Sequence, residues 1–127
     1  MTKKIVATIC AIIILAVIPI SASAETTYFE LYKPEISKTS TILGLYKNGS
    51  ATLKTDTTSN DGVNLYLDYS IPGSGWKNAK HIFAEPRNSA TAGTFTISQA
   101  SSWRGVMNSW WYNGKNCRAS GTVTACN

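Results

Sequence analysis

The chain has 127 residues and a formal net charge of +5, from twelve basic and seven acidic residues. A chain of this length suits one domain with a single hydrophobic core. The basic residues are scattered rather than clustered, which argues against a nucleic-acid-binding surface and leaves only a weak attraction to anionic surfaces.

The first 24 residues have the three-part pattern of a cleavable export signal. Lys3 and Lys4 precede an apolar run of 16 residues, and the small residues that follow end in Ala24 as an A-x-A cleavage site. The run is shorter than the roughly 20 residues that span a bilayer. We therefore expect cleavage between Ala24 and Glu25, secretion of residues 25–127 as one β domain, and no membrane insertion after cleavage.

Alternation of apolar and polar residues predicts strands along the rest of the chain, and no window has a sustained helical period. The clearest strand covers residues 63–69, with Val63, Leu65 and Leu67 on one face and Tyr66 on the other. Such alternation is typical of a half-buried strand. Further strands are expected over residues 28–33, 41–46, 51–56, 77–84, 94–98 and 103–112.

Turn residues between these segments predict sequential hairpins. Asn48-Gly49 and Asn113-Gly114 suit two-residue type I′ turns, because both central positions of that turn need a positive φ. Asn60-Asp61-Gly62 predicts a third hairpin, and Pro72-Gly73-Ser74-Gly75 predicts a break. About eight short strands joined in this way predict an all-β fold, a small antiparallel sandwich or barrel.

Two cysteines follow the export signal, Cys117 and Cys126. An even number of cysteines in an oxidising compartment favours a disulfide. The two lie symmetrically about Gly121-Thr122, so we expect a cross-strand bridge that locks a final hairpin and stabilises it by about 2.7 kcal/mol. The register of the Asn113-Gly114 turn also predicts that Trp110 faces inward beside Cys117.

No catalytic or metal-binding pattern emerges from the sequence. His81 is the only histidine and is interpreted as a surface or edge-strand residue. A G-x-S-x-G nucleophile elbow is missing, no spacing nominates a pair of carboxylates, and His and Cys are too few for a metal site. We therefore expect a protein that is not an enzyme and that uses no cofactor or metal.

Aromatic residues are abundant, because four Trp, six Tyr and three Phe all follow residue 24. Adjacent residues of a strand point to opposite faces, so we expect Trp111 to be exposed if Trp110 is inward. Tyr66 lies on the polar face of its strand, and Trp76 follows the Pro-Gly-Ser-Gly break. Exposed rings flanked by polar residues stack on sugars or anchor a protein partner.

Three functions fit these features. The first is a small secreted β-sandwich binding protein that recognises cell-wall glycan or another surface polymer through Trp111, Tyr66 and Trp76. The second is a secreted bacteriocin-like antimicrobial protein, which the small size, the export signal and the positive charge permit. The third is an inhibitor of an extracellular enzyme that inserts the loop 85–93. The expected partner is a surface polysaccharide or an extracellular protein, and the oligomeric state stays open.

Overall fold

The protein is described by a computed structural model that covers residues 24–110 and 117–127. These residues form seven antiparallel strands in one hydrogen-bonded sheet, which confirms the predicted all-β class. The described segments contain no helix of the length and hydrophobicity needed to cross a bilayer. The strands are β1 (Ala24–Leu31), β2 (Ser37–Thr39), β3 (Leu43–Thr55), β4 (Val63–Ser70), β5 (Lys77–Ala84), β6 (Ser89–Ser109) and β7 (Ala119–Cys126).

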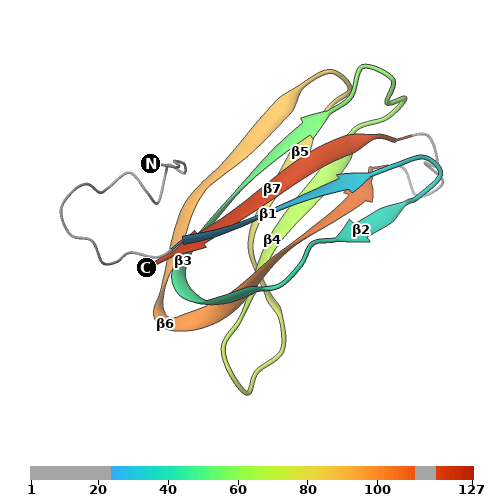
Figure 1. Cartoon of the computed structure of the whole chain (residues 1–127). Helices are drawn as coiled ribbons and strands as arrows, with labels where there is room; N and C mark the ends of the chain where they lie inside the picture. Colours follow the sequence, from blue (N-terminus) through green and yellow to red (C-terminus); the bar gives the residue numbers. More distant parts are fainter. Residues whose placement is uncertain (1–23, 111–116) are drawn as a thin grey trace.

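The sheet folds over on itself because its two longest strands bend. Strand β6 pairs with β3 from Ser89 to Trp103 and with β4 from Ser102 to Ser109, so the two pairings overlap at the bend. Figure 1 shows β6 turning back at one end of the molecule, with β3 curving beside it. One layer therefore contains β1, β7 and the adjoining parts of β3 and β6, and the other contains β5, β4, the rest of β6 and β2.

The hydrophobic core lies between these two layers. At two glycines the backbone of one layer lies close to side chains of the other. An added Cβ at Gly121 would lie 2.9 Å from Leu65, and one at Gly105 would lie 2.7 Å from Val123. The inward face predicted for residues 63–69 is confirmed, because Val63, Leu65 and Leu67 of β4 are fully buried and Tyr69 packs, partly buried, against the core. Fully or almost fully buried core side chains are Leu31, Leu53, Val63, Leu65, Leu67, Trp103, Met107 and Val123.

The strand order differs from the expected succession of hairpins. In the order β1-β7-β3-β6-β4-β5, only β4 and β5 are neighbours both in the chain and in the sheet. Their connection contains the predicted break, where Gly73 has a φ of 85°. Asn60-Asp61-Gly62 does connect two strands, but β3 and β4 pair with other partners rather than with each other. The expected loop 85–93 is shorter, because β6 begins at Ser89.

The hairpin predicted at Asn48-Gly49 is wrong, because β3 runs straight through it. Gly49 pairs with Phe95 of β6 on one side and with Ala125 of β7 on the other. The physical reason is close packing rather than a positive φ. A Cβ at Gly49 would lie 2.3 Å from the indole of Trp103, so the glycine lets that ring lie against the backbone.

The predicted Cys117–Cys126 disulfide is also wrong. The described part of β7 runs from Ala119 to Cys126 as one strand with Gly121-Thr122 in its middle, so no hairpin forms there. Cys126 is the last residue of β7, and Cys117 lies two residues before its first residue. The two ends of β7 are separated by seven steps of about 3.3 Å, or roughly 23 Å, whereas the Cα atoms of a disulfide lie within about 7 Å of each other. Cys117 is a free, buried thiol.

Several sequence predictions fall outside the described residues. These are the export signal up to residue 23, Trp111, and the Asn113-Gly114 turn. Ala24 and Glu25, the predicted cleavage pair, are the first residues of β1 and pair with Cys126 and Ala125.

Candidate functional site

One outer face of the molecule, formed by β5, β4 and β6, carries a row of aromatic and hydrogen-bonding side chains. Pairing places Phe83 beside Asn64, and His81 beside Tyr66, on the side of β4 that faces away from the core. On the other side of β4, register aligns Asn64 with Asn108 and Asp68 with Arg104. We call this surface the aromatic face; its residues are Asn64, Tyr66, Asp68, Trp76, His81, Phe83, Arg104, Asn108 and Trp110.

The centre of the aromatic face is held by a network that crosses three strands. The rings of Tyr66 and His81 stack with centroids 4.4 Å apart and planes 8° from parallel. Nε2 of His81 lies 2.7 Å from Oδ1 of Asn64, and Nδ2 of Asn64 donates to Oδ1 of Asn108 at 3.2 Å. Asn64 is only 6% exposed, so its hydrogen bonds satisfy a buried amide and hold the imidazole in place.

One end of the aromatic face is an arginine stacked on an indole. The guanidinium of Arg104 lies 4.1 Å from the centroid of Trp76 and forms an ion pair with Asp68 at 3.6 Å. Asn78 donates to the same carboxylate at 3.1 Å. These contacts fix Trp76 against the sheet, so its ring lies half-buried rather than fully free.

The other end of the aromatic face is a groove of about 740 Å³. Phe83 and Trp110 meet there edge to face, with centroids 5.3 Å apart and an interplanar angle of 64°. Trp110 is 60% exposed, so much of its ring is open to a ligand. The groove is lined by Asn60, Asp61, Gly62, Asn64, His81, Phe83, Glu85, Pro86 and Trp110.

The turn before β4 builds one wall of this groove. The N–H of Trp110 donates to the carbonyl of Gly62 at 3.0 Å, which positions the indole just after the end of β6. A Cβ at Gly62 would lie 2.3 Å from the ring of Phe83, so the glycine leaves room for that ring. Beneath the turn, the Cys117 thiol contacts the carbonyls of Asp61 and Gly62 at 3.6 and 3.7 Å. Burial raises the pKa of Cys117, which keeps the thiol protonated as a weak donor.

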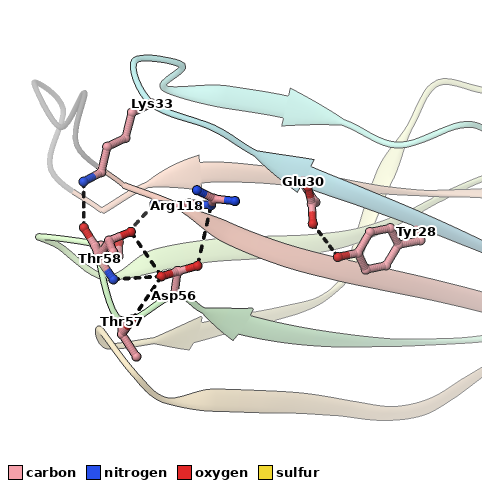
Figure 2. Close-up of polar contacts among 8 residues, drawn as sticks. Tyr28, Glu30, Lys33, Asp56, Thr57, Thr58 and Arg118 are labelled. Atoms are coloured by element: carbon pink, nitrogen blue, oxygen red, sulfur yellow. Dashed lines mark hydrogen bonds and ion pairs between the residues drawn. The ribbon is translucent and has the colours of Figure 1, made fainter.

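A second, smaller groove of about 230 Å³ lies on the opposite layer, over β1, β7 and the end of β3. Of its charged groups, Asp56 forms an ion pair with Arg118 at 3.5 Å and Glu30 accepts a hydrogen bond from Tyr28, whereas Lys54 has no ion pair among the described residues. Figure 2 shows Asp56 facing Arg118, and the hydroxyl of Tyr28 pointing toward Glu30. Tyr28 donates a hydrogen bond to the Glu30 carboxylate at 2.5 Å. Hydrogen bonding to the Glu30 carboxylate raises the pKa of Tyr28. Because Asp56, Arg118 and Glu30 already have partners within the protein, these side chains offer less to a ligand than the aromatic face does.

Acid stability is expected to depend on Asp56. The N–H of Thr58 donates to its carboxylate at 2.8 Å, and this bond, helped by the Thr58 hydroxyl, lowers the pKa of Asp56 below 3.8. A carboxyl with a depressed folded-state pKa stabilises the fold above its unfolded pKa, and loses that effect as pH falls through the folded value. Asp56→Asn should therefore lower Tm slightly at pH 7 and make no difference in strong acid. Thermal melts across pH check this, and a difference that stays constant with pH would contradict it.

The structure brings two of the three predicted binding residues onto the aromatic face, Tyr66 and Trp76. The third, Trp111, lies outside the described residues. The prediction that Trp110 faces inward is wrong, because β6 ends at Ser109 and strand alternation stops there. His81 lies exposed on the edge strand β5, as interpreted from the sequence, but it also joins the network that the sequence did not indicate.

Phe83, Asn64 and Asn108 are site residues that sequence reasoning missed. Phe83 belongs to a weak strand pattern, and the two asparagines look like ordinary polar positions on β strands. Only the pairing of β4 with both β5 and β6 brings them together. Within the described ranges no group of three or more His, Cys, Asp and Glu residues could hold a metal ion.

Comparison with known proteins adds a likeness of fold only. No family model matches the chain, and no curated protein matches it. Among solved structures, the Yersinia pseudotuberculosis-derived mitogen is 14% identical with a TM-score of 0.47, covering 83% of this chain and 86% of its own. PirA is 15% identical with a TM-score of 0.43, covering 84% and 93%. A Bacillus endospore appendage protein, from disulfide-linked pili, is 12% identical with a TM-score of 0.46, covering 83% and 88%.

Proposed function

We propose that this protein is exported and binds a glycan of a cell wall or another surface polymer through its aromatic face. The observation that supports the proposal is the mixture of rings and fixed polar groups on one exposed sheet surface. Aromatic rings offer flat apolar surfaces for the C–H faces of sugars, and placed hydrogen-bonding groups fix orientation and give specificity. Tyr66 with His81, and Phe83 with Trp110, are the two ring pairs of this surface.

The site is preorganised, which favours binding over a purely structural role for these rings. The stacked imidazole and the buried Asn64 hold their positions through hydrogen bonds before any ligand arrives. A ligand then loses less free energy to ordering the protein. The open face of Trp110 and the groove beside it provide room for a sugar ring.

Retention on insoluble glycans tests the proposal. Protein expressed from the full-length sequence is incubated with peptidoglycan, chitin and cellulose, and the bound fraction is measured. We expect retention on at least one polymer, and expect Trp110→Ala and His81→Ala each to weaken it about tenfold, the effect of losing an anchor worth roughly 1.4 kcal/mol.

Tyr28→Ala is the matched control for these variants. Tyr28 is 61% exposed, similar to Trp110, but it lies on the opposite layer. Its loss should leave retention unchanged, and thermal melts establish that all three variants fold. Equal retention of the Trp110, His81 and Tyr28 variants would contradict binding through the aromatic face.

A further inference from the structure

The groove of the aromatic face is acidic, although the chain as a whole is basic. Asp61 and Glu85 line the groove, and neither carboxylate has an ion pair or a side-chain hydrogen bond within residues 24–110 and 117–127. No lysine or arginine of these residues lines it either. His81 is the other titratable group on the groove wall. Two carboxylates that have no ion pair among the described residues thus line the space in which we place the sugar.

The aromatic rings of the same groove favour the same sign of ligand charge. The face of an indole or phenyl ring carries a negative quadrupole and attracts cations, with tryptophan the strongest of the aromatic residues. Trp110 is more than half exposed, and Phe83 meets it edge to face. Rings and carboxylates combined in one groove attract an ammonium group through both its charge and its apolar neighbours.

We propose that the groove recognises a protonated amine on the glycan, so that the preferred ligand is a polymer with free amino sugars rather than N-acetylated or neutral sugars. This inference rests on the proposed glycan binding and specifies its ligand. The amine lies between Trp110 and the carboxylates of Asp61 and Glu85, and the sugar ring continues along the face toward His81 and Tyr66.

Two oligosaccharides that differ only in the amine provide the direct test. Oligomers of glucosamine and of N-acetylglucosamine, equal in length and linkage, are titrated against the protein at mildly acidic pH, where the free amines are charged. We expect the glucosamine oligomer to bind more tightly. Its advantage should shrink as salt is raised, because screening weakens interactions between solvent-exposed charges.

Charge-removing variants connect the preference to the groove. Asp61→Asn and Glu85→Gln should each weaken glucosamine binding about two- to fivefold, the range expected for a solvent-exposed ion pair. The double variant should abolish the preference and leave binding of the N-acetylated oligomer unchanged. Glu30→Gln is the matched control, because it removes the same charge from the opposite layer. If one of the two single variants fails to fold, weaker glucosamine binding by the other is enough to connect the preference to the groove.

Each remaining outcome overturns the inference. If both oligomers bind equally, or the N-acetylated one binds better, recognition of an amine is wrong while glycan binding stands. If neither binds, the inference fails, and retention on the neutral polymers decides the proposed function separately. If a lysine oligomer binds as tightly as the glucosamine oligomer, the charge is recognised without a sugar, and the amino-sugar proposal is wrong.

Discussion

Replacing Trp103 by alanine is expected to lower the free energy of unfolding by about 3–5 kcal/mol, the usual cost of deleting a buried large aromatic side chain. Trp103 is 0% exposed, and its indole N–H donates to the carbonyl of Tyr46 at 2.9 Å. The residue lies where β6 bends between the two layers, so its loss leaves a cavity at the junction of both. A loss of this size is a large share of a small domain's total stability.

Urea unfolding monitored by far-UV circular dichroism measures this effect. Trp110→Ala is the control, because that indole is 60% exposed and should cost much less. If the two tryptophan variants were destabilised equally, Trp103 would not be the centre of the core that the structure indicates.

The second large effect is expected at Gly49. Alanine there brings a Cβ to 2.3 Å from the Trp103 ring, a separation that requires either the ring or the strand to move. Overpacking of this kind typically costs about 1–3 kcal/mol. Gly93→Ala is the matched control on β6, because its Cβ would meet nothing within 4 Å. We expect Gly93→Ala to change stability by less than about 0.5 kcal/mol.

A double variant distinguishes a packing cost from a backbone cost at Gly49. If the clash with the indole is the cause, the smaller ring of Trp103→Phe should relieve it, and the two substitutions together should cost less than their sum. If Gly49 instead occupied a turn that needs a positive φ, the two costs would add. Chemical unfolding of the single and double variants checks this, and additivity would contradict the close packing of β3 on Trp103.

The face that the clearest strand presents to the core was predictable from local sequence. Val63, Leu65 and Leu67 alternate with polar residues, and alternation of side chains is a property of any extended chain. The same reasoning correctly placed Tyr66 on an outer face. None of these predictions needs knowledge of a neighbouring strand.

The pairing of strands was not predictable from the same signals. Asn48-Gly49 matches a strong local turn signal, but the backbone of Gly49 gains partners on both sides and its missing side chain accommodates Trp103. Cys117 and Cys126 likewise suggested a hairpin, although β7 holds the two residues apart. A local turn preference is worth little against several ladder hydrogen bonds and a buried indole, both of which are long-range.

The sequence by itself determined that this protein is all-β and antiparallel, and which side chains of its clearest strands turn inward. Only the tertiary structure decided that Phe83 meets Trp110, that Asn64 joins His81 to Asn108, and that Asp61 and Glu85 face one groove. Alternation is local to each strand, whereas a binding surface on a sheet depends on which strands pair and in what register, and the collapse of the whole core selects that pairing.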